Sequence, residues 1–448
     1  MKQGYMLTAI AAAVAAFSSA AFADPAETKG GIKIKTEDGR FEATVGGRIH
    51  IDFNLLDNDT AALFGSNTLS NNSTVFFRRA RISLTGKAYG WEYNFVPDFA
   101  QSAGGNLPAV TTTTTTTTTV NTGDGNNTCE ATPCTVTTTS TSSTTGTTST
   151  IAFQELYIAR AFDSGKLFIG QFKPYRSLEE LTSSNEITMM ERPWTSATGV
   201  YGGGVNRQFV IGLGYQWYVM DNMTLSAAVY NLRRDNTAAT EGSGGSARFT
   251  YAPLMKEGSV VHLGASYSVD NPHNGVSVST LTPYAGRRGP SAALGGGSAN
   301  RDAQHIGLEA ATVFGPFYGQ AEYVMADYDQ TAPATPDNVG VDVWHLTLSF
   351  NVTGETKPYD NKKAVFKNIK PAHDFGAVEL TARYDSGKND DATAATAIET
   401  VNASTLGVNY YLNPNVRFML NYVMGQAERV NGQDDKPNVL AARFQMNW

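Results

Sequence analysis

The stretch FEATVGGRIHIDFNLL, residues 41–56, alternates between two kinds of side chain. One parity is apolar or small and consists of Phe41, Ala43, Val45, Gly47, Ile49, Ile51, Phe53 and Leu55. The other parity is mostly polar and consists of Glu42, Thr44, Gly46, Arg48, His50, Asp52 and Asn54. A period of two is typical of a β-strand with one apolar and one wet face. This strand is much longer than the usual length of about five or six residues, so its apolar face must meet something wider than a small soluble core.

The N-terminus is typical of an export signal. Lys2 precedes an apolar stretch at 6–17, and small residues follow, ending in the triplet at 21–23, Ala-Phe-Ala. This arrangement predicts a secretory signal peptide over residues 1–23, too short to span a bilayer, with cleavage after the triplet. A buried N-terminal helix is the less favoured alternative. Loss of Lys2 changes the formal net charge from −7 to −8.

Composition and the C-terminus indicate a membrane barrel. The chain has 43 Gly, 22 Phe, 20 Tyr and 5 Trp but only 17% charged residues. After the signal peptide, no stretch approaches the roughly 18 consecutive apolar residues of a helical membrane span. Aromatic clusters at 91–95, 215–218 and 409–412 fit the two interfacial girdles of a transmembrane barrel. The final segment, VLAARFQMNW (439–448), alternates again, and its terminal aromatic Trp448 resembles the assembly signal of Gram-negative outer-membrane barrels.

Alternating segments recur along the whole chain. They are 40–56, 75–89, 91–100, 152–162, 165–173, 206–219, 223–234, 246–253, 258–269, 278–286, 301–314, 316–328, 341–353, 374–386, 402–412, 415–427 and 437–448. These seventeen candidates are one too many, because single-chain bacterial barrels have an even number of strands. Short turns alternate with long connections, and only 278–286 breaks this order, so we assign 270–300 to one long external loop.

The predicted fold is therefore all-β. We expect a sixteen-stranded antiparallel transmembrane β-barrel over residues 40–448, preceded by an N-terminal periplasmic segment at 24–39. Both termini are then periplasmic, and a barrel of this size encloses a water-filled channel. The apolar parity of the opening stretch faces lipid, and Arg48, His50 and Asp52 face the water inside.

Several blocks resemble the phosphate-selective porin O and P family. They are FFRRARISLTGKAYGWEYNF (76–95), GQFKPYRSLEELTSSNEITMMER (170–192), VVHLGASY (260–267), HIGLEAATVFGPFYGQAEY (305–323) and LGVNYYLNPNVRFMLNYV (406–423). The similarity runs from about residue 40 to the end of the chain. It implies an outer-membrane homotrimer of sixteen-stranded barrels. It also implies arginines stacked as a ladder toward a constriction, where lysines and serines hold anions.

The resemblance assigns ladder positions residue by residue. They are Arg48 in GGR, Arg78 and Arg79 in FFRR, Arg192 in MER and Arg288 in GRRG. Guanidinium suits this role because it stays charged and binds oxyanions through two parallel hydrogen bonds. Each arginine could instead pair with a facing carboxylate and stiffen the barrel. Arg78 has the parity of lipid-facing neighbours, so a bulge or the trimer interface would have to accommodate it.

The resemblance also places a loop in the pore. Residues 174–193 match the family loop that folds inward, and Ser183 and Ser184 match its anion-contacting serines, although helix capping is an equal alternative. Glu92 and Glu180 stand where the family constriction supplies lysines. Ionised and pointing inward, they would weaken a phosphate site. We therefore expect an outer-membrane porin for small hydrophilic solutes, either anions such as phosphate or, alternatively, a general or weakly selective range.

Two segments depart from an ordinary barrel loop. The insertion at 101–151 holds nine consecutive threonines and the only cysteines, Cys129 and Cys134, which should form a disulfide in an exported protein. Its threonine tracts lack a hydrophobic pattern, and we expect them to be mobile at the cell surface. Residues 354–373 carry five lysines where a short periplasmic turn is expected. They form either a solvated basic loop or a positive collar at the periplasmic mouth.

Other functional classes are less favoured. One alternative is a barrel enzyme, such as an outer-membrane protease or phospholipase. The six histidines form no recognisable triad or metal-ligand spacing, so we expect no catalytic residues, metal or other cofactor. A surface adhesin that uses the barrel as an anchor is a second alternative, suggested by the threonine-rich insertion. The expected partners are outer-membrane lipid, small anionic or polar solutes, two further copies of the chain, and the barrel assembly machinery acting on the strand that ends at Trp448. We expect no nucleic-acid partner.

Overall fold

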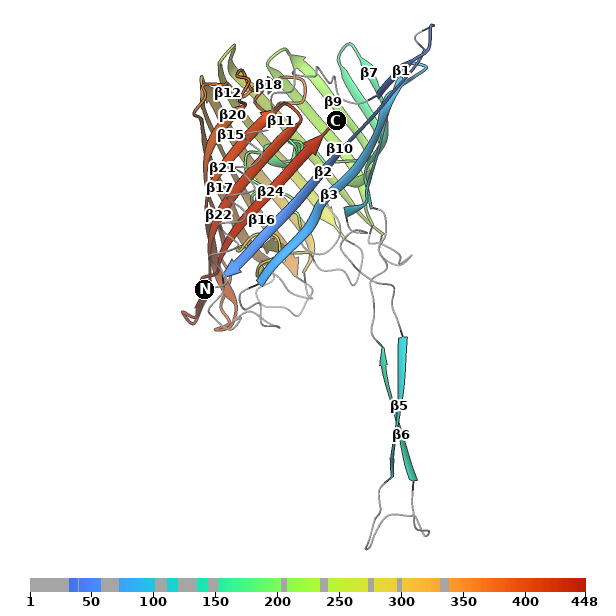
Figure 1. The fold of residues 1–448 in the computed structure, drawn as a ribbon, viewed down its shortest axis with the longest axis vertical. Helices are drawn as coiled ribbons and strands as arrows, with labels where there is room; N and C mark the ends of the chain where they lie inside the picture. The colour runs from blue at the N-terminus through green and yellow to red at the C-terminus, as the bar shows by residue number, and fades with distance from the viewer. Residues whose placement is uncertain are drawn as a thin grey trace, which may run out of the picture.

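The chain folds into a closed antiparallel β-barrel (Figure 1). The computed structural model describes residues 32–38, 40–57, 72–100, 111–119, 135–143, 152–202, 208–233, 241–272, 278–295, 300–330 and 338–448. Within these residues sixteen strands form the wall: β2 (Phe41–Asp57), β3 (Asn72–Ala88), β4 (Trp91–Asp98), β7 (Ala152–Phe162), β8 (Gly165–Phe172), β9 (Val210–Met220), β10 (Met223–Arg233), β11 (Glu241–Lys256), β12 (Ser259–Asn271), β15 (Asn300–Phe314), β16 (Phe317–Gln330), β17 (Asn338–Asn351), β20 (Ala377–Asn389), β21 (Ile398–Asn413), β22 (Val416–Arg429) and β24 (Asn438–Asn447). The predicted fold is confirmed.

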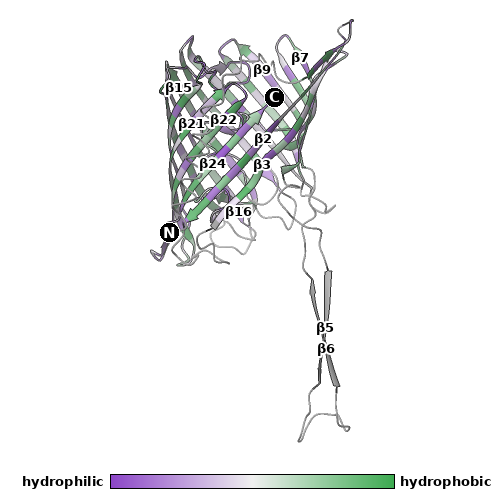
Figure 2. Ribbon diagram, in the orientation of Figure 1, coloured by the Kyte–Doolittle hydropathy of each residue, from purple (hydrophilic) through white to green (hydrophobic). Residues whose placement is uncertain are grey.

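The two faces of each strand meet different surroundings. In β2, Phe41 and Phe53 are 42% and 39% exposed on the outside, whereas His50 and Asp52 are only 0% and 2% exposed. Figure 2 shows the same alternation of hydrophobic and hydrophilic residues along β2, β3 and β24. The polar parity therefore points inward, as expected. Among the described residues, no helix has the length and apolar character needed to cross a bilayer.

The barrel closes where its first and last strands meet. β2 pairs with β24 from Arg48 opposite Asn447 to Asp57 opposite Asn438. Beyond this ladder, the backbone N–H of Gly47 donates to the Trp448 carbonyl at 3.0 Å, and the Trp448 N–H donates to the Gly47 carbonyl at 3.1 Å. β1 (Ile32–Lys35) then pairs with the first residues of β2, from Ile32 opposite Val45 to Lys35 opposite Glu42. The C-terminal residue thus completes the seam.

Between the end of β12 at Asn271 and the start of β15 at Asn300, the described residues form no wall strand, as predicted. These residues include a small hairpin of β13 (Thr280–Thr282) and β14 (Ala292–Leu294). Rather than extending outward, this hairpin packs on the inner wall, because Val278, Tyr284 and Leu294 are fully buried. The Thr280 and Tyr328 hydroxyls are 2.7 Å apart, which ties the hairpin to β16.

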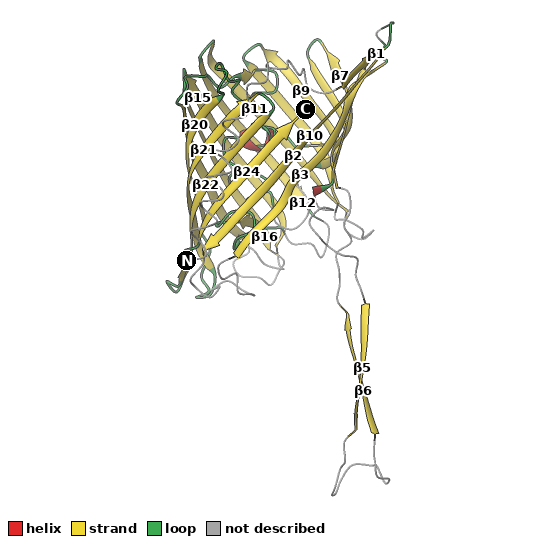
Figure 3. Cartoon of the chain, in the orientation of Figure 1, coloured by secondary structure: helices red, strands yellow, loops and turns green. Residues whose placement is uncertain are grey.

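The threonine-rich insertion forms regular structure. β5 (Thr111–Thr119) and β6 (Thr135–Ser143) pair antiparallel, with Thr111 opposite Ser143 and Thr119 opposite Thr135. Figures 1 and 3 show this two-stranded ribbon apart from the barrel wall. β-branched threonine favours strand backbone even without a hydrophobic face. The mobility of these tracts stays a prediction. Cys129 and Cys134 lie outside the described residues, as does the signal peptide, so both remain predictions.

We predict that Gly47→Ala weakens the seam. A Cβ at this position would lie 2.4 Å from Trp448 Cζ2 and 2.8 Å from the Arg81 carbonyl oxygen. The free energy of unfolding, measured by urea titration of tryptophan fluorescence, should fall by about 1–3 kcal/mol. Gly245→Ala is the matched control, because its nearest neighbour would be at an ordinary 3.6 Å. Equal stability of the two variants would contradict this account of the seam.

Candidate pore constriction

Residues 173–202, here called the pore loop, fill the lumen between β8 and β9. The loop contains one short helix, α3 (Leu178–Leu181), which Figure 3 shows within the outline of the barrel. Ser177, at a left-handed φ of 57°, caps this helix by accepting a hydrogen bond from the Glu180 N–H. Ser183 and Ser184 follow α3, and Ser183 begins the next turn, where its Oγ accepts the Asn185 N–H at 3.4 Å and its carbonyl accepts the Glu186 N–H at 2.8 Å. A capping role of Ser183 in this turn therefore remains an alternative.

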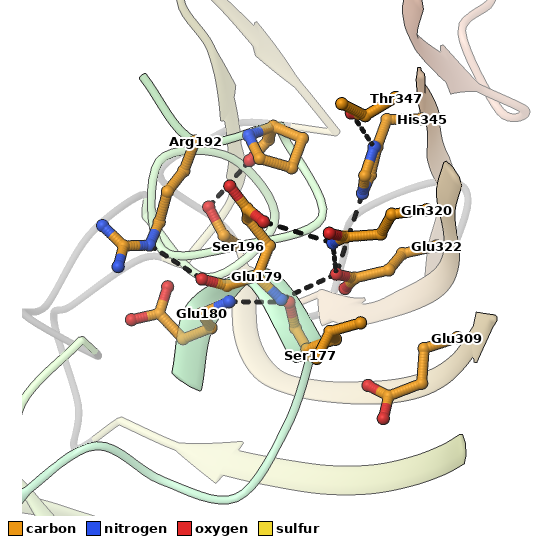
Figure 4. A network of polar contacts seen from close by, with 12 residues as sticks. Ser177, Glu179, Glu180, Arg192, Ser196, Glu309, Gln320, Glu322, His345 and Thr347 are labelled. Atoms are coloured by element: carbon orange, nitrogen blue, oxygen red, sulfur yellow. Dashed lines mark hydrogen bonds and ion pairs between the residues drawn. The ribbon is translucent and has the colours of Figure 1, made fainter. Parts of the chain in front are cut away.

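Strands β12 and β16, which flank β15, hold the first half of the pore loop. Arg176 contacts Asp270 of β12 at 3.2 Å, and both side chains are fully buried. The Glu179 N–H donates to Glu322 Oε1 of β16 at 2.7 Å. Gln320 Nε2 bridges the Glu179 and Glu322 carboxylates at 3.2 and 2.8 Å (Figure 4). These contacts fix the first half of the loop in the lumen.

A second attachment lies at the barrel seam. Arg443 of β24 forms two hydrogen bonds of 2.7 Å with its cross-strand partner Asp52 of β2. The same guanidinium reaches Glu191 of the pore loop at 2.7 Å. Glu191 also accepts two hydrogen bonds from Arg78, at 2.6 and 2.8 Å. Burial alone would raise the pKa of Glu191, but Arg78 and Arg443 hold it well below its ordinary value.

Arg78 reaches the interior through a bulge, one of the two expected solutions. His50 of β2 pairs with Arg79, whereas the next residue, Ile51, pairs with Phe77, so Arg78 is the extra residue. A bulge re-aims side chains locally. Arg78 therefore has a structural role, the alternative considered for each ladder arginine, because it pairs with the Glu191 carboxylate and anchors the pore loop.

The pore loop borders a polar cavity of about 590 Å³. Among the described residues, its lining contains eight cationic side chains and two carboxylates, namely Arg48, Arg79, Arg81, Lys173, Arg192, Lys363, Lys367, Lys370, Glu155 and Glu186. Arg48 Nη1 donates to Ser183 Oγ at 3.3 Å and to Ser184 Oγ at 3.1 Å. The structure thus brings five of the six predicted anion-binding residues together in one lining, namely Arg48, Arg79, Arg192, Ser183 and Ser184.

Not every cation around the cavity is available to a solute. Arg81 pairs with Asp98 at 2.7 Å. Arg192 Nε donates to the Glu179 carbonyl at 3.0 Å, and its Nη2 donates to the Thr182 carbonyl. In contrast, Arg79 is 6% exposed, and its Nε has no hydrogen-bond partner among the described residues. A buried, unsatisfied N–H donor in a cavity wall is a group that a bound anion can satisfy.

Three sequence-predicted positions lie elsewhere. Arg288 is exposed and stacks on the Phe76 ring at 4.5 Å, outside the cavity lining. Glu92 is 2.5 Å from Lys166, so a local cation neutralises it away from the cavity. Glu180 is fully buried, and its Oε2 accepts the Ala197 N–H at 2.7 Å.

Glu180 is part of the internal structure of the pore loop. Burial would raise its pKa, but Lys173 and Arg192 lower it below the ordinary value. The carboxylate is therefore charged and turned into the loop. Our expectation that Glu92 and Glu180 replace cations at the constriction is not matched by this arrangement, because strand and loop position alone do not specify side-chain direction.

Residues 352–376, here called the inner turn, fold into the lumen from the short-turn rim. Their centre is buried: Ala364, Val365 and Phe366 are 1–2% exposed, and β18 (Tyr359–Asp360) pairs with β19 (Val365–Phe366). Lys357 Nζ donates to Thr188 Oγ1 of the pore loop at 2.8 Å. A freely solvated loop is excluded by this burial. The apolar triplet within the basic stretch was the signal that could have revealed it.

The inner turn also supplies charge to the cavity. Lys363, Lys367 and Lys370 are part of the lining. Lys367 pairs with Glu186 at 3.3 Å, and Asn368 Nδ2 donates to the Asn185 carbonyl at 2.5 Å. The collar interpretation correctly expected basic side chains at this end of the pore, but they lie deeper and touch the pore loop.

Comparison with known proteins identifies the family of this chain. The family model described as "Phosphate-selective porin O and P" matches residues 43–127 and 135–448. The chain belongs to this family. Porin O of Pseudomonas aeruginosa is 28% identical, and the alignment covers 96% of each chain. An uncharacterised protein of Caulobacter vibrioides is 24% identical over 62% of this chain and 58% of its own length.

Solved structures share the fold at much lower identity. The outer membrane channel DcaP of Acinetobacter baumannii has a TM-score of 0.54 at 12% identity, covering 94% of this chain and 100% of that one. An anion-selective porin from Comamonas acidovorans has a TM-score of 0.53 at 10% identity, covering 91% and 100%. Family membership and the barrel together make this chain an outer-membrane porin, and at the family level a channel rather than an enzyme.

We predict that Glu191→Gln loosens the pore loop. The substitution leaves Arg78 and Arg443 buried beside a neutral amide, and loss of one partner from a buried ion pair costs about 3 kcal/mol. Thermal unfolding followed by circular dichroism should shift to lower temperature, and single-channel current should become noisier. Glu257→Gln, in an exposed turn, should change neither property.

Low pH should destabilise the parent protein, as Glu191→Gln does. Because the folded-state pKa of Glu191 is lowered, its stabilisation is complete above the unfolded value of about 4.3 and is lost as the pH falls through the folded pKa. Below about pH 4, the stability difference between the parent and Glu191→Gln should therefore shrink. A difference that does not change with pH would contradict the charge-based anchoring.

Proposed function

We propose that this porin conducts small hydrophilic anions by passive diffusion and that inorganic phosphate and similar oxyanions are its preferred solutes. The single observation that carries the proposal is the charge of the constriction cavity, where eight cationic side chains face two carboxylates. Narrow regions with one sign of charge and low-dielectric walls concentrate counter-ions. The same field repels cations, which gives the pore its selectivity.

Arg48 and Arg79 are the proposed primary contacts. They lie on the lumen parity of adjacent strands, where Arg79 pairs with His50 of β2. Arg48 is already bound to two serine hydroxyls, so Ser183 and Ser184 orient it and can themselves donate to an oxyanion oxygen. Arg79 has an unsatisfied donor at Nε, and Arg81, which pairs with Asp98, has another at Nη2. Arg192, bound to two backbone carbonyls, acts through its positive charge.

Conduction requires that binding be weak enough for release. The lysines of the inner turn offer further cationic positions on the periplasmic side of the same cavity. A series of neighbouring sites of similar strength lets an ion move on without being trapped. The weakly selective alternative rests on Glu155 and Glu186, which lower the positive potential of the cavity wall.

We further propose that the protein forms a homotrimer in the outer membrane. Its signal peptide is cleaved after residue 23 during export, and the barrel assembly machinery recognises the strand that ends at Trp448. Cys129 and Cys134 form a disulfide. The apolar outer faces of the strands support lipid and subunit contacts. Light scattering on the purified, unheated protein, corrected for detergent, should give three chains per particle. A stable monomer would contradict the trimer.

We predict that phosphate blocks chloride current through the parent pore and that Arg48→Ala with Arg79→Ala weakens this block about tenfold or more. Each lost charged hydrogen bond contributes about 1.5–3 kcal/mol to anion binding. The measurement is the phosphate concentration for half-block in planar bilayers. Arg160→Ala is the control, because this exposed arginine of β7 stacks on Trp91 and Phe162 outside the cavity. Equal block in all three proteins would contradict the assigned contacts.

A further inference from the structure

Lys173 occupies a place in the constriction that nothing in the strand pattern indicated. It directly follows β8 and opens the pore loop. Its Nζ donates to the Glu180 carbonyl at 2.5 Å and to the Thr182 carbonyl at 3.3 Å. These two backbone oxygens hold the ammonium beside Ser183 and Ser184, and the side chain forms part of the cavity wall.

The ammonium retains capacity for a ligand. An ammonium has three N–H donors, and two of them are used by the carbonyls of Glu180 and Thr182. Within the described residues no carboxylate lies within ion-pair distance of Lys173, whereas Lys166, Lys357 and Lys367 each have such a partner. The Phe209 ring lies 5.9 Å away and also lines the cavity. Lys173 is therefore a cation whose charge is not neutralised by direct contact.

The charged groups around Lys173 come from three elements. Arg192 and Glu180 belong to the pore loop, Arg79 to β3 and Glu155 to β7. The two arginines disfavour a charged ammonium, and the two glutamates favour it. Glu180 acts through space only, because its carboxylate is turned toward the Ala197 N–H.

We propose that Lys173 is a specificity-determining residue of the constriction, whose ammonium contacts permeating oxyanions and contributes to the anion preference of the pore. The proposal rests on the proposed anion-conducting function. Lys173 then supplies the cation of the constriction from the start of the pore loop. The Glu180 carboxylate instead accepts the Ala197 N–H inside the loop. The positive charge is thus supplied from a different position of the same loop.

The direction of the pH effect follows from burial. Removal from water, followed by repulsion from Arg192, lowers the pKa of Lys173 to about 7. Below this value the ammonium is charged and attracts anions. As the pH rises through about 7, the side chain becomes a neutral amine, and the attraction declines. Arginine at the same position would stay charged over the whole range.

The test is the ratio of chloride to potassium permeability, from zero-current potentials in a KCl gradient between pH 5.5 and 9. Chloride is used because phosphate itself titrates near neutral pH. In the parent, the ratio should fall roughly two- to fivefold with a midpoint near pH 7, the effect expected of one charge acting over about 8–10 Å in a wet lumen. Lys173→Met should give the low ratio at every pH, and Lys173→Arg the high one.

Lys370→Met is the matched control. It removes one charge from an exposed lysine of the same cavity lining, so the ratio should drop slightly at all pH values while the neutral-pH step remains. A parent without the step, or a step that persists in Lys173→Met, would overturn the role of Lys173. Thermal unfolding of each variant verifies that the barrel is intact.

Failure of the underlying function would look different. A parent pore without anion preference at pH 6 contradicts the proposed function. A step near pH 7 that disappears in both Lys173 variants would still support titration of Lys173 in the conducting path. The two claims are therefore tested by different features of one data set.

Discussion

The guanidinium of Arg443 connects the seam that closes the barrel with the loop that narrows it. It binds its cross-strand partner Asp52 across the junction of β24 and β2, and it also binds Glu191 of the pore loop. In a bilayer no strand edge can remain unpaired, so the junction must form before the barrel is stable. Buried charges, in turn, are tolerated only when they are paired. One cation therefore couples barrel closure to the position of the constriction, and Trp448 completes the same junction by pairing with Gly47.

The lumen divides its charges between structure and transport. Asp52, Asp98, Glu191 and Asp270 each pair with an arginine, and these pairs hold the wall and the pore loop. These four carboxylates are thus occupied by structural ion pairs. In the part of the chain that the structure describes, most of the cationic side chains that line the cavity have no carboxylate in direct contact. Arg79 and Lys173 are the clearest examples among the described residues. Anion preference then arises from an excess of cations remaining after the structural pairs have formed, and the inner turn adds lysines to that excess.

Strand positions could be predicted from the sequence because a period of two reports directly which face is wet. β2 and β7 begin and end within about one residue of expectation, and the parity of Arg48, Arg79 and Asp52 was correct. The pore interior was harder to predict. Loops have no such period, so the inward turn of Glu180 and the placement of Lys173 depend on backbone contacts that lie outside any local pattern. Arg78 violated its parity for a different reason, since a bulge inserts one residue into the ladder.

We propose that the cavity between the pore loop and the inner turn makes this porin select anions. The most direct measurement is the zero-current potential of the unmodified pore in a tenfold KCl gradient at pH 6 and low ionic strength, where screening is weakest. The account predicts a potential of the sign that chloride permeation gives, with a magnitude that declines as total salt rises. A potential near zero, or one of the sign that potassium permeation gives, would contradict it.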